Sequence, residues 1–137
     1  MMNYEPEATA NKVIATQTIL AVDDEEALGD FLVRVIEQET PYQALSATDA
    51  VQALQVVSSI KPSLFILDYQ LPGINGLELS DQLHSIEGLE TVPILMVSAD
   101  SPSRKAMQQR HITFLKKPFN LSDLLQAIEE LLPQQAG

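Results

Sequence analysis

The chain has 137 residues, 45% of them hydrophobic, and its 19 acidic and 8 basic residues give a net charge of -11. This composition is typical of one globular domain with its own core. The acidic excess argues against nucleic acids and anionic membranes as partners, since both attract clustered Lys and Arg. There is no cysteine, so disulfides and thiolate sites are excluded. Without a signal-peptide core or a run near the ~20 residues of a membrane span, we expect a cytoplasmic protein.

Residues 1–17 are small and polar without a clear period, and we expect a loose lead-in. Thr18–Val22 is predicted to be the first strand, which ends at the acidic run 23–26. Apolar side chains then recur at intervals of three and four, which indicates a helix that Asp24 or a neighbour opens and Thr40 ends. Its apolar face is expected to consist of Leu28, Phe31, Leu32, Val35 and Ile36.

Residues 42–47 are predicted to be a short second strand near an edge of the sheet. Thr48 or Asp49 then caps a second helix, whose inner face is expected to hold Ala50, Leu54 and Val57. Residues 64–67 are wholly apolar and fit a strand buried on both faces. A buried helix segment would read the same over four residues, but the prolines on both sides favour the strand.

After Gly76 a third helix is expected to run to about residue 85, with Leu79, Leu83 and Ile86 inward. Residues 92–97 are predicted to be the fourth strand. A short fourth helix over 103–110 is expected to follow a Ser101 cap with Pro102 at its first position, and with Ala106 and Met107 inward.

Residues 112–115 are predicted to be the fifth strand. Asn120 then caps a last helix that ends at Pro133, with Asp123 completing an arrangement like a capping box. The apolar period of this helix is the strongest in the chain and consists of Leu121, Leu124, Leu125, Ile128, Leu131 and Leu132.

Strands and helices therefore alternate five times. Such alternation predicts an α/β fold with a parallel sheet covered by helices on both faces. The five-stranded version is the doubly wound, flavodoxin-like fold with strand order 2-1-3-4-5. We expect one domain over residues 18–133, followed by a tail at 134–137.

Polar side chains follow four of the predicted strands: Asp23 and Asp24, then Asp68, Ser98 and Lys117. In a parallel sheet these strand ends meet at one edge, where α/β folds bind ligands. Each residue alone has a plainer interpretation, as a helix cap, a loop carboxylate, a turn residue or a solvated lysine. Together they indicate a site, because three close carboxylates repel one another unless a cation such as Mg²⁺ joins them.

Such a site suits phosphoryl chemistry. A carboxylate can attack phosphorus to form an acyl phosphate, and Mg²⁺ and Lys117 would stabilise the charge on the transferring oxygens. Ser98 would donate a hydrogen bond to the same group. His84 and His111 are far from the carboxylates in sequence and are expected to be surface residues rather than phospho-donors.

Four motifs resemble those of a response-regulator receiver domain of the chemotaxis-regulator type, which acts in two-component signalling. They are VDDE at 22–25, DYQLPGINGLEL from Asp68, VSAD at 97–100 and KPF at 117–119. The resemblance covers Thr18 to about Leu132. It implies a phosphorylation switch whose partners are a sensor histidine kinase or a phosphotransfer protein, and a downstream effector or missing output domain. Catalysis is then limited to the chain's own phosphorylation and dephosphorylation.

The resemblance also implies a role for each site residue. Asp68 is the phospho-acceptor, and Mg²⁺ is bound by Asp23, Asp24, Asp68 and the backbone carbonyl of Gln70. Ser98 and Lys117 contact the phosphoryl group. Phe114, three residues before Lys117, matches the aromatic switch position.

One feature departs from the family pattern. The 18 residues between Ser98 and Lys117 contain no glycine, so the fourth helix is expected to be short or irregular. In the family this face transmits the signal and often forms a homodimer, so the usual partner surface is in question here.

Two alternatives stay open. One is a pure interaction module that keeps the fold without the switch. The other is a phosphohydrolase with an aspartyl-phosphate intermediate, which needs a general acid near the nucleophile. The haloacid-dehalogenase pattern places that acid two residues after the nucleophile, where this chain has Gln70.

Overall fold

The computed structural model describes residues 17–132. Five strands form one parallel sheet in the order β2-β1-β3-β6-β7. Numbered along the chain, these five strands have the order 2-1-3-4-5, so the predicted flavodoxin-like fold is confirmed. Their bounds are β1 Thr18–Val22, β2 Gln43–Ala47, β3 Leu64–Asp68, β6 Ile94–Ser98 and β7 Ile112–Lys116.

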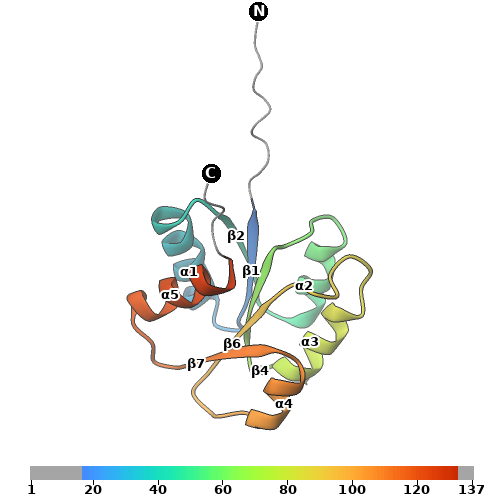
Figure 1. Cartoon of the computed structure of the whole chain (residues 1–137). Helices are drawn as coiled ribbons and strands as arrows, with labels where there is room; N and C mark the ends of the chain where they lie inside the picture. Colours follow the sequence, from blue (N-terminus) through green and yellow to red (C-terminus); the bar gives the residue numbers. More distant parts are fainter. Residues whose placement is uncertain (1–16, 133–137) are drawn as a thin grey trace, which may run out of the picture.

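Helices cover both faces of the sheet, as Figure 1 shows. One face is covered by α1 (Glu26–Glu39) and α5 (Leu121–Leu131), and the other by α2 (Ala50–Val57) and α3 (Gly76–His84). The fourth helix, α4 (Arg104–Gln109), has six residues and packs beside β7. The predicted shortening of this helix is therefore confirmed.

The core has two parts because side chains alternate between the faces of a strand. In β3, Leu64 and Ile66 pack under α1 and α5, whereas Phe65 and Leu67 pack under α2 and α3. All four are at most 1% exposed, as a central parallel strand requires. Packing on both faces thus fixes the position of the central strand and of the residues at its end.

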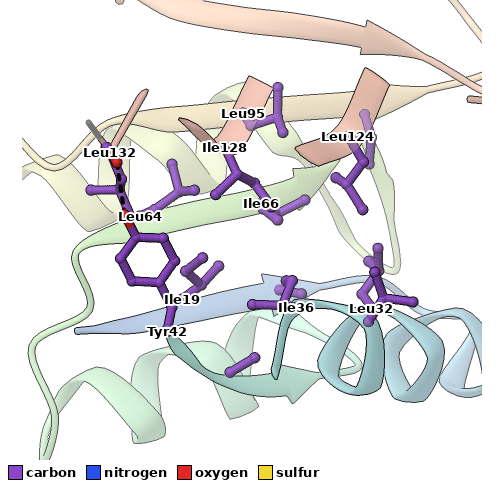
Figure 2. Packing of buried hydrophobic residues seen from close by; sticks show 14 residues of the cluster. Ile19, Leu32, Ile36, Tyr42, Leu64, Ile66, Leu95, Leu124, Ile128 and Leu132 are labelled. Atoms are coloured by element: carbon purple, nitrogen blue, oxygen red, sulfur yellow. Dashed lines mark hydrogen bonds between the residues drawn. The ribbon is translucent and has the colours of Figure 1, made fainter. Parts of the chain in front are cut away.

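Figure 2 shows the core beneath α1 and α5 and the hydrogen bond at one end of it. The Tyr42 hydroxyl donates to the Leu132 carbonyl oxygen over 2.7 Å. Burial raises the pKa of Tyr42, and the charge of Glu129 raises it further. The bond fastens the end of α5 to the start of β2.

A small antiparallel hairpin, β4 (Gln70–Leu71) and β5 (Ile74–Asn75), follows β3 and was not expected from the sequence. Its turn is Pro72-Gly73, with Gly73 in the left-handed region at φ 76°. Proline followed by a glycine of positive φ is a typical turn pair. The prediction recognised the turn residues but not the two-residue strands beside them.

The start of α1 agrees with the prediction, whereas one residue of its expected apolar face does not. Glu25, a neighbour of Asp24, is the N-cap, and its side chain makes no capping hydrogen bond. The Glu25 amide instead donates to Asp23 Oδ1 over 2.8 Å. Phe31, expected on the buried face, is 48% exposed, because it borders a surface hollow rather than the core.

The predicted cap of α4 was wrong. Ser103 caps the helix by accepting from the Ala106 amide over 3.1 Å. Pro102 is buried ahead of this cap rather than at the first helical position. The helix therefore begins at Arg104, two residues later than the predicted first position at Pro102.

Most other helix ends agree with the prediction. Asp49 caps α2 and Asn120 caps α5. Asn75 and Glu78 form a capping box at α3 that was not foreseen. On α2 the fully buried residue is Ala53, which the prediction omitted. The predicted inward residues of that helix are half-buried: Ala50, Leu54 and Val57.

The predicted lead-in and tail lie almost entirely outside the described residues, as does Pro133. Gln17 is described, and its carbonyl oxygen accepts from the Gln43 amide over 2.9 Å. Two strands begin later than predicted, β2 at Gln43 and β6 at Ile94. Leu121, the first residue of α5, is 41% exposed despite its place in the apolar period.

Candidate functional site

The residues predicted to bind the metal ion or the phosphoryl group lie at the carboxyl edge of the sheet. Asp68 and Ser98 are the last residues of β3 and β6, and Asp23 and Lys117 directly follow β1 and β7. The parallel register pairs Asp68 with Val97, one residue before Ser98, and so holds these strand ends level with one another.

Three carboxylates meet there. Asp23, Asp24 and Asp68 each present an oxygen, and these oxygens lie within 4.8 Å of one another. Asp23 and Asp68 are only 2% and 6% exposed, whereas Asp24 is exposed. Two carboxylates of the cluster are therefore buried, and the third faces solvent.

Lys117 lies between the two buried carboxylates. Its ammonium nitrogen is 3.0 Å from Asp23 Oδ2 and 3.4 Å from Asp68 Oδ2. Burial alone would lower the pKa of Lys117, but the hydrogen bond and charge of Asp23, together with Asp68, outweigh burial and raise it. Lys117 is thus held in its charged form inside the site.

The environment of Asp68 makes its charged form costly. Burial raises the pKa of this carboxyl, and the charge of Asp23 adds to the increase. The Gln70 amide, which donates to Asp68 Oδ1 over 3.2 Å, and Lys117 oppose the shift without cancelling it. A single lysine therefore does not compensate the negative charge gathered here.

The donor set fits a hard divalent cation. Carboxylate oxygens are among the ligands that Mg²⁺ prefers, and Mg²⁺ commonly keeps several waters. The exposure of Asp24 leaves one side of the cluster accessible to such waters. One Mg²⁺ and the Lys117 ammonium would balance the three carboxylates. The predicted fourth ligand, the Gln70 carbonyl, stays a prediction.

A pair of hydrogen bonds links the loops beside the site and was not foreseen. The Gln70 side-chain amide donates to Asp100 Oδ2 over 2.6 Å. The Asp100 backbone amide donates to Ser98 Oγ over 3.1 Å. The sequence placed Gln70 and Asp100 each two residues past a site residue, but only tertiary structure brings the β3 and β6 loops together.

Phe114 and the two histidines were also singled out in the sequence. Phe114 lies in β7 opposite Met96 and is half-buried against the core beneath α2 and α3. His111 is exposed, whereas His84 is half-buried, with Nε2 2.8 Å from the Val92 carbonyl oxygen. Neither histidine belongs to the carboxylate cluster.

An apolar hollow of about 410 Å³ borders Lys117. Leu28 and Phe31 of α1 line it together with Pro118 and Phe119, which follow Lys117. The exposed side chain of Phe31 is therefore part of a concave surface beside the site.

Comparison with known proteins agrees with this geometry. The model of the response regulator receiver domain family matches residues 19–129. The chain belongs to this family. Receiver domains act in signalling, and they bind Mg²⁺ at an acidic pocket that corresponds in character to the cluster of three carboxylates found here.

Individual relatives differ in how much of their length this receiver domain matches. Phosphate regulon transcriptional regulatory protein PhoB of Pseudomonas aeruginosa is 31% identical over 119 residues, covering 85% of this chain and 52% of that protein. Sporulation initiation phosphotransferase F of Bacillus subtilis is 28% identical over 124 residues, covering 88% and 98%. The chain thus spans about half the length of some curated relatives and almost all of another.

Among solved structures, response regulator protein TrrA from Thermotoga maritima, in complex with Mg²⁺ and BeF, has a TM-score of 0.74. It is 28% identical, with 85% of this receiver domain and 100% of that chain covered.

Within residues 17–132, none of the helices combines the length and apolar character needed to cross a bilayer.

Proposed function

We propose that this receiver domain is a phosphorylation switch in which Asp68 accepts a phosphoryl group in a Mg²⁺-dependent reaction. The observation that carries the proposal is the meeting of three carboxylates with Lys117, which contacts both Asp23 and Asp68. Asp23, Asp24 and Asp68 would hold the metal ion, with the Gln70 carbonyl as a further ligand. The donor is a histidine kinase or a phosphotransfer protein.

The reaction follows from the positions of the side chains. A carboxylate oxygen of Asp68 attacks the phosphorus while the bond from phosphorus to the donor's imidazole nitrogen breaks, and the electron pair leaves with the imidazole. Mg²⁺, when bound, supplies charge stabilisation for the transferring oxygens. The Lys117 ammonium adds a second positive charge beside Asp68.

Ser98 is arranged to donate to the phosphoryl group. Its oxygen accepts from the Asp100 amide, and a hydroxyl that accepts one hydrogen bond still has a proton to donate. The side chain is 1% exposed and directly follows Val97, which pairs with Asp68 in the sheet. Phosphorylation would draw Ser98 toward Asp68 and let Phe114 turn further inward, which changes the surface along β6 and β7.

The apolar hollow beside Lys117 suits the donor protein. A kinase must place its phosphohistidine next to Asp68, and protein surface then covers the residues around the site. Leu28, Phe31 and Phe119 offer apolar contacts in the hollow that Lys117 also lines. The identity of the effector, dimerisation through the α4 face and the cytoplasmic location stay predictions.

The test is intact mass after incubation with acetyl phosphate and Mg²⁺. We expect the wild type to gain one phosphoryl group, and to lose this gain without Mg²⁺ or in Asp68→Asn. Asp30→Asn, which removes an exposed carboxylate of α1, is the matched control and should be labelled normally. Labelling of Asp68→Asn would refute the assigned acceptor, and an unlabelled wild type that is folded would favour a pure interaction module.

Phe31→Ala extends the same series to the donor surface. Labelling by acetyl phosphate should be unchanged, because this small donor does not need the apolar hollow. Transfer from a protein that carries phosphohistidine should slow. Equal transfer rates to wild type and Phe31→Ala would exclude the hollow as the donor surface.

A further inference from the structure

Gly76, the first residue of α3, packs directly against the backbone that carries Asp68. A Cβ atom at Gly76 would lie 2.7 Å from the Asp68 carbonyl oxygen, 3.0 Å from Tyr69 Cα and 2.5 Å from Met96 Sδ. Real Cβ atoms essentially never show contacts under 3.0 Å. Any other residue at this position therefore forces a neighbour to move.

Glycine is needed at this position for space and not for backbone conformation. Gly73, in the hairpin turn, has a φ of 76° and nothing within 4 Å of a Cβ atom. Gly76 lies outside the left-handed region but is buried against three neighbours. Substitution of Gly73 would therefore strain the backbone, whereas substitution of Gly76 would cause a steric clash. Only Gly76 lies close to the phospho-acceptor.

The start of α3 is too firmly held to retreat from an added side chain. The Asn75 side chain accepts from the Glu78 amide over 2.8 Å, and the Glu78 side chain accepts from the Asn75 amide over 3.0 Å. The Gly76 amide donates to the Tyr69 carbonyl oxygen over 2.7 Å. The first two bonds hold the first turn of the helix together, and the third ties that turn to Tyr69, the residue after β3.

Of the atoms that a Cβ would meet, those of the backbone decide the outcome. The Met96 side chain has three rotatable bonds and can move its sulfur aside. The Asp68 carbonyl oxygen can move only if the end of β3 moves with it. The Asp68 carboxylate would then shift relative to Lys117 and to the Gln70 amide, which it contacts at 3.4 Å and 3.2 Å.

We propose that Gly76 is a positioning residue for phosphoryl transfer. Because it has no side chain, α3 can pack against the Asp68 backbone and hold the carboxylate in line with the other groups of the site. The inference rests on the proposed function of Asp68. Misplacement of a reacting group by about 1 Å can cost on the order of 100-fold in rate.

The experiment compares Gly76→Ala with Gly73→Ala, and each with the wild type. Both variants should lose stability. Gly73→Ala puts a side chain on a left-handed residue, and Gly76→Ala puts one against close neighbours. Only Gly76→Ala should slow labelling by acetyl phosphate, by about 10- to 100-fold, at protein concentrations corrected for the folded fraction. In the metal-free proteins, only Gly76→Ala should speed hydrogen exchange at the Tyr69 amide, which donates to the Val97 carbonyl oxygen over 3.0 Å.

A double variant separates the two kinds of neighbour. Gly76→Ala with Met96→Val shortens the flexible side chain while the Asp68 carbonyl stays in place, so labelling should remain slow. Recovery of the wild-type rate would overturn the inference and assign the effect to Met96. Failure of both Gly76 variants to fold would overturn it too, by making Gly76 a residue of stability alone.

The outcomes also separate this inference from the proposed function. If the wild type is not labelled, the proposed function fails, and the exchange rate of the Tyr69 amide still decides whether Gly76 sets the end of β3. If the wild type is labelled and Gly76→Ala matches Gly73→Ala in rate and exchange, only the positioning role is lost.

Discussion

Lys117 contributes to the stability of the metal-free site as well as to its proposed chemistry. It contacts two carboxylates that are almost fully buried. Removal of one partner from such a group leaves uncompensated charge, which costs more than the attraction itself. The lysine therefore offsets part of the negative charge that the two carboxylates bring into the folded protein.

Lys117→Met should lower the free energy of unfolding of the metal-free protein by about 2 kcal/mol, less than the ~3–5 kcal/mol of a fully buried pair. Lys116→Met is the matched control, because Lys116 is exposed, and should change stability by no more than about 0.5 kcal/mol. Urea unfolding measures both. Mg²⁺ should restore part of the loss, and equal losses in the two variants would contradict the role given to Lys117.

At the residue scale the sequence was enough to predict which residues gather at the edge of the sheet but not the contacts among the loops beside them. Asp23, Asp24, Asp68 and Lys117 were found because they directly follow apolar strands, and strand ends in a parallel sheet must meet. The bond between Gln70 and Asp100 was not found. It joins the side chains of two loops, and the sequence pattern of a loop does not predict which of its side chains will contact another loop.

Among the elements, α4 depends most on contacts outside itself. Its six residues are too few for a stable helix on their own. Arg110, directly after its last residue, donates to the Ala106 carbonyl oxygen and forms two hydrogen bonds with Asp81 of α3, at 2.8 and 3.0 Å. These bonds tie the end of α4 to its neighbour.

Arg110→Ala should loosen α4 without unfolding the domain. The pair with Asp81 is partly exposed, so we expect a loss of less than about 1 kcal/mol in the free energy of unfolding. Amide hydrogen exchange in α4 should become faster by about threefold, which corresponds to part of that energy. Arg104→Ala is the control, since Arg104 is exposed on the same helix and makes no ion pair within residues 17–132. Equal exchange rates in the two variants would show that the pair does not hold α4.

The elements that the sequence predicted best are those whose packing agrees with their local pattern. The buried strand β3 and the strongly periodic α5 are examples. The hairpin β4–β5 was missed because two-residue strands carry no measurable period. The cap of α4 was misassigned because the prediction followed the local serine-proline pair at Ser101 and Pro102, whereas the helix begins after Ser103 and Pro102 is buried ahead of it.

At the scale of the whole molecule, the charged form of Asp68 opposes folding when no metal ion is bound. Burial first, and then the charge of Asp23, raise the pKa of Asp68 in the folded state. Between the ordinary value of 3.8 and the raised value, the folded state holds more protons than the unfolded state. The stability that Asp68 contributes is therefore present below the ordinary value and is lost as the pH rises through the raised one.

Asp68→Asn should accordingly stabilise the metal-free protein at neutral pH, by on the order of 1 kcal/mol. The difference from wild type should vanish as the pH falls below 3.8, where Asp68 is protonated in both states. Thermal unfolding as a function of pH measures this difference, and Asp30→Asn controls for the change in net charge. A destabilised Asp68→Asn at neutral pH would contradict the sign.

Mg²⁺ should reverse the order of the two proteins. A ligand that binds only the folded state at 100 times its dissociation constant adds about 2.7 kcal/mol to stability. Wild type has all three carboxylates and should gain more of this than Asp68→Asn. The negative charge of Asp68 therefore destabilises the metal-free protein and stabilises the protein that has Mg²⁺ bound.

The hydrogen bond between Tyr42 and Leu132 also bears on the order of events in folding. Its partners are 90 positions apart in the chain, so it closes one of the largest loops in the domain. We expect this bond to form after the sheet has assembled and α5 has docked, because other contacts then already hold its two ends together. A contact made after the rate-limiting step does not speed folding, but it must be broken early when the protein opens. We therefore expect the bond to slow unfolding and to prolong the lifetime of the folded state, with little effect on how quickly that state is reached.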